Sequence, residues 1–399
     1  MITSAQISHY KSISEAFLKF RNLNVIVGPN GSGKSNILDA LCFLHDCASD
    51  DIDTAITKRH GIDSLRQWSR TRPYNIIIEI SFANDLGHGQ YKLVIASNKG
   101  SYKIIEETGN WFGPHPRERI VRNKDSIPGY SHFKRNEEGK IDAKTDFSDI
   151  SVERVNRVDQ EETILKYLGS RLPLGTLGVF KPIFDELSSF AKYNIYPNTL
   201  RNPQLVSRET TLVEDGSNLA SVLKKINSNR RYSDNKENII KAIQTIMPSV
   251  SDFQIKSAGG FYVPVIRVKE SSDDIHDFNL SQISDGTLRT LGLLTAFYQY
   301  SAPDKIGIEE PEQMIHPGAL QIIHEAMAEF VKRSTRFGRQ VFVTTHSPTF
   351  IDLFEAEDIL WAKLRSGVTD CGHIRPRQLD IIKRQLFSAG ELLLAEGIA

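Results

Sequence analysis

Residues 25–41, VIVGPNGSGKSNILDAL, place a glycine-rich loop between a β-branched run and an amphipathic run. The β-branched residues predict a strand over 24–28. Ile37, Leu38, Leu41 and Leu44 recur at helical spacing, which predicts a helix over 35–47. Strand, loop and helix therefore follow one another directly, and the glycines between them permit backbone conformations that other residues avoid.

The loop matches the pattern G-x-x-x-x-G-K-[ST]. In such a loop the backbone N–H groups point at phosphate oxygens, and the positive end of the following helix adds to the attraction. The lysine reaches the β and γ phosphates, and the final hydroxyl holds Mg²⁺. The residues expected to bind ATP are Gly28, Pro29, Asn30, Gly31, Ser32, Gly33, Lys34 and Ser35, with Ser35 also a magnesium ligand. No Asn-Lys-x-Asp sequence for reading guanine occurs, which favours ATP over GTP.

Composition limits the other possibilities. The 399 residues have room for two or three domains of roughly 150 residues each. Lys+Arg and Asp+Glu are equal at 49 each, so any affinity for nucleic acid or a membrane must come from a local patch. Three scattered cysteines indicate neither a disulfide framework nor a zinc site. No secretory signal and no run of 18 apolar residues is found, so we expect a cytoplasmic protein without a membrane partner.

The rest of the chain is organised around this loop. Before residue 110, further strands are predicted over 2–9, 16–20, 74–83, 90–97 and 102–107. After residue 279, helices over 285–300 and 317–331 alternate with strands over 305–309, 340–345 and 359–363. Such alternation implies a mainly parallel sheet.

The middle of the chain has a different texture. Residues 111–146 are polar, broken by glycine and proline, and predicted to be rich in loops. Helices are predicted over 163–167, 179–193, 219–227 and 237–246, and strands over 253–257 and 261–268. We therefore divide the chain into an N-terminal head segment (1–110), an inserted lid or arm (111–278) and a C-terminal head segment (279–399).

An apolar strand that ends in acids follows far downstream. The sequence Ile306-Gly-Ile-Glu309-Glu310-Pro311 has the form of a Walker B segment, in which Glu309 holds magnesium and Glu310 orients or deprotonates the attacking water. A solvated acidic loop is the alternative, since Glu312 lengthens the acidic run.

Two more motifs flank these acids. Ser284-Asp-Gly286 opens a leucine-rich helix, whose free N–H groups and dipole suit a γ-phosphate. His346 ends another apolar strand in "TTHSP", and either motif alone is compatible with an ordinary structural role. Their order and their positions at helix or strand ends, where a parallel sheet collects its chemistry, favour a shared site.

Together the four motifs resemble those of the ABC-type ATPases, and more closely those of the RecF and SMC-like branch, which includes stand-alone ATPases of bacterial antiphage systems. "ISHYKSI" at 7–13 and "GIEEPEQMIHP" at 307–317 are similar to wording of that branch. The resemblance covers about 1–108 and 279–399 and is faint over the insert. It implies an α/β fold: a P-loop head with a mainly parallel sheet flanked by helices, an antiparallel β-subdomain, and an inserted, mostly helical lid.

The resemblance also implies roles for residues. Ser284 and Gly286 would contact the ATP held by a second protomer, His346 would sense the γ-phosphate, and the segment after Ile315 would form the D-loop of a homodimer interface. This chain has Glu309 where the family has Asp, ISDGT for LSGGQ, and His316 for the D-loop acid. Gln67 lies in the region expected for the Q-loop glutamine.

The length of the insert suggests what the ATPase acts on. Gly33 and Gly286 lie 253 positions apart, and in the SMC branch such an insertion touches DNA or a partner. Within 217–244, six Lys or Arg face only two acids, and Arg117, Arg119, Arg122 and Lys124 form a second basic group; either could bind phosphodiesters or be a solvated surface. Only 53 residues follow His346, too few for a nuclease domain, so we expect a separate effector such as a nuclease.

The leading hypothesis is thus an ATP-hydrolysing dimeric switch that couples ATP state to DNA or an effector, in genome maintenance or antiphage defence. A nucleotide-gated scaffold with little turnover is the alternative, because the signature is altered. A transporter ATPase would leave the insert unexplained.

Overall fold

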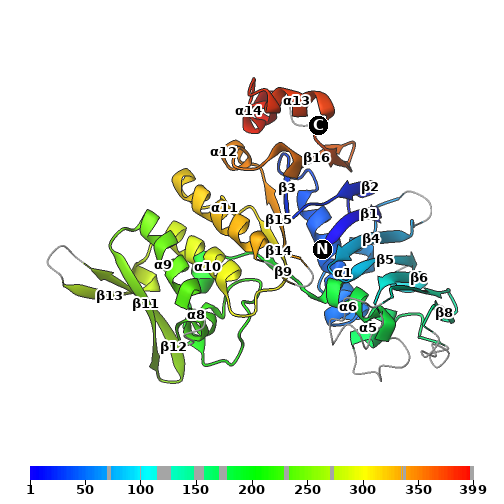
Figure 1. Cartoon of the computed structure of the whole chain (residues 1–399), viewed down its shortest axis with the longest axis horizontal. Coiled ribbons are helices and arrows are strands. Elements are labelled where there is room, and N and C mark those ends of the chain that lie inside the picture. The colour runs from blue at the N-terminus through cyan, green and yellow to red at the C-terminus, as the bar shows by residue number, and fades with distance from the viewer. Residues whose placement is uncertain are drawn as a thin grey trace.

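One large sheet organises the molecule. The computed structural model describes residues 1–69, 73–98, 100–114, 127–147, 157–169, 178–228, 233–269, 274–333, 335 and 338–395. Thirteen strands form the sheet in the order β8-β7-β6-β5-β4-β1-β2-β17-β16-β3-β15-β14-β9. A second lobe, with a four-stranded sheet of its own, lies beside it (Figure 1).

Five neighbouring strands of the large sheet are parallel, and they carry the predicted motifs. They are β16 (Ile359–Arg365), β3 (Leu23–Val27), β15 (Gln340–Thr345), β14 (Lys305–Glu309) and β9 (Phe190–Tyr193). Their carboxyl ends meet at one edge, where a parallel sheet collects its functional groups.

The rest of the sheet is mainly antiparallel. It comprises β1 (Ile2–Tyr10), β2 (Ile13–Lys19), β4 (Ile76–Asn84), β5 (Gly87–Asn98), β6 (Ser101–Gly113), β7 (Gly129–Arg135) and β8 (Ile141–Thr145), joined to β16 through β17 (Val368–His373). The parallel and antiparallel regions are therefore one continuous sheet.

Side chains on the two faces of the parallel strands belong to two separate cores. Along β3, Val25 and Val27 point into one core, and Ile26 between them points into the other. The core around Ile26 contains α1 (Lys34–Ser49), α5 (Ile164–Gly169) and α6 (Lys181–Ser188). The core around Val25 and Val27 contains α10 (Asp285–Tyr298) and α11 (Pro317–Lys332). Helices thus cover both faces, as the near-continuous apolar strands require.

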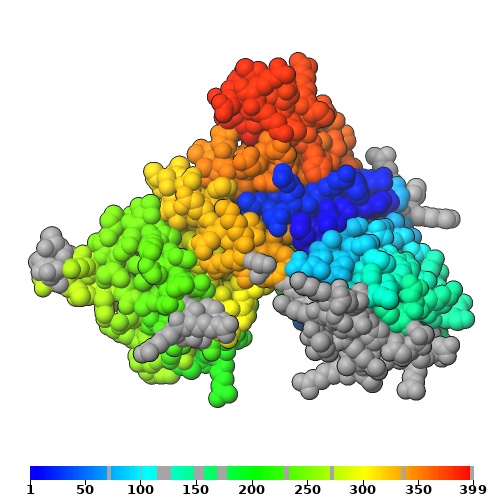
Figure 2. All heavy atoms as spheres, viewed as in Figure 1, coloured from blue at the N-terminus to red at the C-terminus, as the bar shows by residue number. Residues whose placement is uncertain are grey.

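The second lobe continues from the α10 core. In Figure 2 it lies on the far side of the yellow and orange residues from the blue N-terminal strands. Its elements are α7 (Pro197–Arg201), β10 (Gln204–Leu205), α8 (Leu219–Ser228), α9 (Ser233–Ile246), β11 (Val250–Ala258), β12 (Phe261–Lys269) and β13 (Ile275–Asn279).

Short helices complete the described chain. They are α2 (Ile52–Thr57) and α3 (Ile62–Leu65) after α1, and α12 (Pro348–Ile351), α13 (Pro376–Lys383) and α14 (Ala389–Ala395) near the C-terminal end. None of the helices in the described ranges combines the length and the apolar composition that a membrane span needs.

The predicted fold class is confirmed: parallel strands with helices on both faces, an antiparallel region and an added, largely helical lobe are all present. Two local predictions are wrong. The helix predicted over 179–193 ends at Ser188, and Phe190–Tyr193 forms β9 because the exposed edge of β14 offers it a parallel partner. Loop-rich 111–146 contains the β7–β8 hairpin, which buries Phe133.

These strands bear on the insert predicted over 111–278. Because β7, β8 and β9 join the large sheet, the second lobe takes up only the part of that range that follows β9. The division of the chain into two head segments and an insert, and the boundaries between them, remain predictions.

Candidate nucleotide site

The predicted phosphate loop joins β3 to α1, and two of its glycines are required by their surroundings. Gly33 has a φ of 95°, and a Cβ there would lie 2.0 Å from Thr369 Oγ1. A Cβ at Gly28 would lie 2.1 Å from the carbonyl oxygen of Ala362. Side chains at these positions would push β16 and β17 away, so the loop can pack against the sheet only with glycine.

Lys34 is buried, at 5% exposure, and its ammonium is held by the loop itself. Nζ donates to the carbonyl oxygens of Gly28 at 2.8 Å and Pro29 at 3.0 Å. Burial lowers the pKa of Lys34, while the charges of Glu310 and Glu312 raise it. Because β15 pairs with both β3 and β14, the loop and these acids lie at the same edge of the sheet, close enough for their charges to interact.

The other predicted loop residues divide between surface and interior. Pro29, Asn30, Gly31 and Ser35 are exposed, so a ligand can reach them. Ser32 is buried, and its hydroxyl has no hydrogen-bond partner among the described residues. A buried polar atom left unpaired beside exposed backbone fits a loop whose partner is a phosphate.

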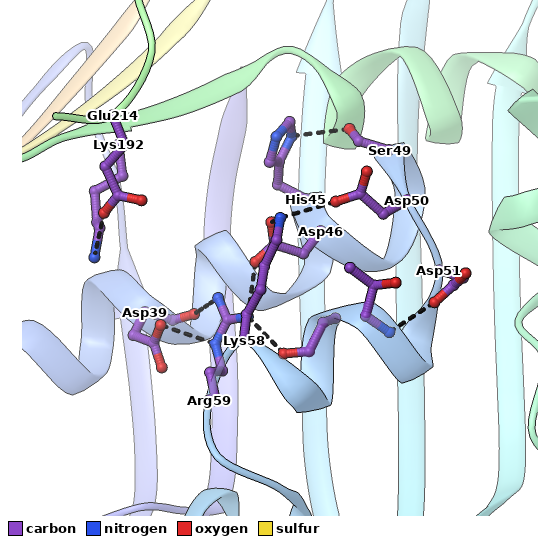
Figure 3. Close-up of polar contacts among 12 residues, drawn as sticks. Asp39, His45, Asp46, Ser49, Asp50, Asp51, Lys58, Arg59, Lys192 and Glu214 are labelled. Atoms are coloured by element: carbon purple, nitrogen blue, oxygen red, sulfur yellow. Dashed lines mark hydrogen bonds and ion pairs between the residues drawn. The ribbon is translucent and has the colours of Figure 1, made fainter. Parts of the chain in front are cut away.

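A cluster of charges braces α1 one turn after the loop. The Asp39 cluster consists of Tyr10, Lys11, Asp39, Asp46 and Arg59 (Figure 3 labels three of these). Asp39 accepts from Arg59 Nε at 2.9 Å, from Lys11 at 2.6 Å and from the Tyr10 hydroxyl at 2.7 Å. Burial acts to raise the pKa of Asp39, but the charges of Arg59 and Lys11 lower it overall. Sequence reasoning missed this cluster, which fixes the helix that presents the loop.

Beside the cluster lies a polar cavity of about 480 Å³. Figure 3 shows charged side chains around it from α1, from the turn after α2, from β9 and from the second lobe. Its three cations are already paired: Lys58 and Arg59 with Asp46, and Lys192 with Glu214 at 3.0 Å. The cavity therefore offers no free positive charge to a phosphate.

The acids at the end of β14 form the second part of the site. Glu309 is the last residue of the strand and pairs in register with Thr344 of β15. Glu310 follows with a φ of 42°, a left-handed conformation that is uncommon for a residue with a side chain. Its backbone N–H donates to the carbonyl of Thr344 at 2.9 Å, and Gln313 donates to its carboxylate. The carboxylate is thereby directed away from the strand.

His346 meets these acids, as its predicted place in a shared site requires. Its Nδ1 lies 3.4 Å from Oε1 of Glu310 and 3.4 Å from Oε1 of Glu312. Its side chain is 43% exposed, so the ring can also reach a ligand. The structure thus brings together the phosphate loop, the acidic strand end and the histidine within one chain.

Glu312 also belongs to this arrangement, although sequence reasoning treated it only as an extension of the acidic run. Its side chain is only 8% exposed, and it accepts from Thr345 Oγ1 at 2.6 Å and from the backbone N–H of His346 at 3.1 Å. A solvated acidic loop does not describe it. It ties the histidine segment to the end of β14. The sequence signal for this contact is an acid two residues after Glu310, together with a threonine directly before the histidine that can donate to it.

Ser284 and Gly286 lie at the start of α10. Ser284 is exposed and caps the helix, accepting from the N–H of Thr287 at 3.3 Å. A Cβ on Gly286 would lie 2.8 Å from the carbonyl oxygen of Met314. The start of α10 therefore packs against Met314, which is 58% exposed and lies just before the segment predicted as the D-loop, where His316 caps α11. Arg201 of α7 also holds this turn, donating to the carbonyl of Ile283 at 2.9 Å.

The remaining predicted residues lie apart from this arrangement. Gln67 donates its backbone N–H to the carbonyl of His9 at 2.9 Å, and no contact with the motifs assigns it as the Q-loop residue. In the basic stretch of the insert, Lys224 and Lys225 lie over tyrosine rings and Lys236 and Lys241 pair with acids. The basic residues at 117, 119, 122, 124, 230 and 231 lie outside the described residues.

The residues present fit ATP with Mg²⁺. The loop supplies a glycine cradle, a buried lysine and an exposed serine hydroxyl, and the strand end supplies carboxylates. Within the described ranges no group of three or more His, Cys, Asp or Glu is placed to hold a metal ion. A magnesium ion bound by one hydroxyl and one carboxylate takes its other ligands from phosphates and water, which is the usual arrangement.

Comparison with known proteins is consistent with this geometry. A family model described as "AAA domain, putative AbiEii toxin, Type IV TA system" matches residues 23–352. An "ATP/GTP phosphatase" of Helicobacter pylori is 21% identical over 372 residues, covering 89% of this chain and 88% of that protein. A "DNA replication and repair protein RecF" of Porphyromonas gingivalis is 29% identical over 107 residues, 26% of each chain.

Solved structures agree on the fold. An SMC head bound to the C-terminal winged-helix domain of ScpA superposes with a TM-score of 0.51 at 14% identity, covering 93% of this chain and 96% of that one. A Pyrococcus furiosus SMC head with an extended coiled coil, bound to the C-terminal domain of ScpA, gives 0.51 at 11% identity over 96% and 99%. Identities this low establish a shared fold alone.

Proposed function

Because this chain belongs to the family described as AAA domain, putative AbiEii toxin, Type IV TA system, and is an ATPase with an ABC-like head of the RecF and SMC branch, we propose that it works as a dimeric switch. Two protomers would close on two ATP molecules, each held between the phosphate loop of one protomer and the Ser284 turn of the other. Hydrolysis would then release the pair.

One observation carries this proposal. The helix that starts at the phosphate loop and the helix that starts at Ser284 belong to different cores, on opposite faces of the parallel strands. Ser284 is exposed, and its hydroxyl accepts a hydrogen bond from Thr287 of its own turn. An exposed serine at a helix N-terminus favours a ligand from outside the protomer. In a dimer related by a two-fold axis, the ATP held by each protomer would meet the Ser284 turn of the other, so the same contact would form twice.

Within the proposed site each residue has a distinct task. The loop N–H groups and Lys34 bind the triphosphate, and Ser35 and Glu309 would hold Mg²⁺, which neutralises charge on the phosphates when bound. Glu310 orients the attacking water and accepts its proton, since its carboxylate projects from the strand end beside His346. His346 contacts the γ-phosphate and transmits its presence to Glu312 through the backbone.

The second lobe would carry the output. Helix α10 begins at Ser284 and continues into the core shared with α8 and α9, so closure around ATP would move the lobe as a unit. We propose that this movement controls a separate effector protein such as a nuclease. DNA is a further candidate ligand, favoured by the short RecF similarity, although the four described lysines of the 217–244 stretch are engaged in internal contacts.

The test separates an enzyme from a nucleotide-gated scaffold. Phosphate release by the wild type should fall at least about 100-fold in Glu310→Gln, because the proton acceptor is removed. ATP-dependent dimerisation, measured by light scattering, should persist in this variant. The control Glu325→Gln changes an exposed acid of α11 and should release phosphate at the wild-type rate. Release by the wild type no faster than background would support the scaffold instead.

A further inference from the structure

Arg289 is a buried cation at the back of the acidic strand end. It lies on the second turn of α10 and is only 1% exposed. Its Nη2 donates to the backbone carbonyl of Glu310 at 3.0 Å. Its Nε and Nη1 have no hydrogen-bond partner among the described residues, and its guanidinium lies over the ring of Tyr196 at 5.6 Å.

Such a residue is costly for the folded chain. Burial lowers the pKa of Arg289, and the nearby Tyr196, Glu312 and Glu310 only partly oppose that effect. A buried charge with unpaired donors is usually less stabilising than an apolar side chain of the same volume. The neighbours of Arg289 along α10, Leu288 and Leu291, show that this core accepts leucine readily. Stability alone therefore does not explain an arginine here.

The residue that Arg289 holds is itself strained. Glu310 has a φ of 42°, a left-handed conformation that is unfavourable for a residue with a side chain. Three hydrogen bonds to its backbone maintain it: its N–H donates to Thr344 of β15, and its carbonyl accepts from the N–H of Gln313 at 3.1 Å and from Arg289 of α10. The bond from Gln313 comes from the same turn, whereas the bond from Arg289 joins this carbonyl to α10. Without the Arg289 bond the turn is no longer fixed to that helix, and the carboxylate of Glu310 loses its fixed position.

We propose that Arg289 is a positioning residue that fixes the backbone of Glu310 from the helix that begins at Ser284. Arg289 lies five positions after Ser284, so the helix start proposed to meet a phosphate and the guanidinium that holds Glu310 belong to one rigid segment. The alignment of Glu310 then depends on where α10 stands. This inference rests on the proposed role of Glu310 in the reaction.

The experiment compares kcat, KM and thermal unfolding of the full chain. Arg289→Met should lower kcat about 10- to 30-fold, the loss expected for one hydrogen bond from a charged donor, with KM within about twofold. Arg289→Lys keeps a donor and should recover part of kcat. The control Arg339→Met removes a guanidinium that lies 4.5 Å from the Phe330 ring and also has unpaired Nε and Nη1. It should keep the wild-type kcat.

The outcomes separate the inference from the function on which it rests. A wild-type kcat in Arg289→Met, or equal losses in Arg289→Met and Arg339→Met, would overturn the inference. Should Arg289→Met fail to fold, Arg289→Lys decides: a reduced kcat at unchanged KM supports the role, and an unchanged kcat and KM refute it. In a Glu310→Gln background, Arg289→Met should leave the residual rate unchanged. If Glu310→Gln itself keeps full turnover, the proposed function fails first.

Discussion

Two charged clusters flank the phosphate loop, and they are built differently. In the Asp39 cluster, Asp39 has three donors and Arg59 bridges it to Asp46. At the end of β14, two nitrogen atoms of Arg289, and also Glu312 Oε2 and Thr344 Oγ1, lack hydrogen-bond partners among the described residues. In the first cluster the charged groups pair with one another, and these pairs fix the position of α1. The second keeps unmet hydrogen bonds and a strained glutamate, as expected of a site completed by its ligands.

Lys34 lies between the two clusters, and its removal should give the largest effect. Lys34→Ala should weaken ATP binding at least about 100-fold, because a charge-assisted hydrogen bond contributes about 1.5–3 kcal/mol and the lysine can make two. Equilibrium binding of a fluorescent ATP analogue measures this. The control Lys166→Ala, an exposed lysine paired with Glu162, should bind normally. Equal binding by both variants would mean that this loop is not the nucleotide cradle.

The Asp39 cluster should affect stability more than chemistry. Asp39→Asn should lower the free energy of unfolding at neutral pH by about 3 kcal/mol, since it removes the largely buried charge that pairs with Arg59 and Lys11 and leaves Arg59 with Asp46 alone. Urea unfolding measures this loss. Asp50→Asn, which changes a half-exposed acid that pairs with Lys58, should cost no more than about 0.5 kcal/mol. Similar losses in the two variants would contradict the contrast between the clusters.

The same variant has a defined pH dependence. The folded pKa of Asp39 is lowered from its usual 3.8, so its stabilisation is complete above that value and is lost as pH falls through the folded pKa. The stability difference between wild type and Asp39→Asn should therefore be largest near neutral pH and shrink below about pH 4. A difference that grows on acidification would show that the cluster does not hold a carboxylate.

His346 should have the smallest effect, and one confined to the reaction. His346→Ala should reduce kcat about tenfold, as expected for one polar contact to the transition state, while leaving stability unchanged because the ring is 43% exposed. Steady-state phosphate release and thermal unfolding measure the two quantities. His276→Ala, an exposed histidine of β13, should match the wild type in both. A loss of stability without loss of kcat would assign His346 to the structural cluster.

The local part of this site could be predicted from sequence, because each motif is short and carries its own geometry. The glycine loop after β3, the acids ending β14 and the histidine ending β15 all lie where strand and helix periodicity predicted. Strand Phe190–Tyr193 could not be predicted, because its own sequence continues a helical pattern. It forms a strand because it pairs with the edge of β14, which is distant in the sequence.

The supporting contacts were hidden for a similar reason. Asp39 and Arg59 are 20 positions apart on separate helices, and only their packing brings the charges together. Arg289 sits in a leucine-rich run, where sequence gives no sign that its head group faces the carbonyl of Glu310. In the sequence Glu312 extends a run of acids that could be solvated, and only the fold shows that it is buried beside Thr345.

The central claim is that neither protomer alone completes the site, and mixing two inactive variants tests it most directly. Lys34→Ala removes triphosphate binding by the phosphate loop. Ser284→Arg blocks the helix start that would contact the ATP of the partner protomer. Each variant alone should release almost no phosphate. After subunit exchange at equal amounts, half of the dimers are mixed with one intact site each, so about a quarter of the wild-type rate should return. A mixture no more active than the sum of its parts would contradict the account.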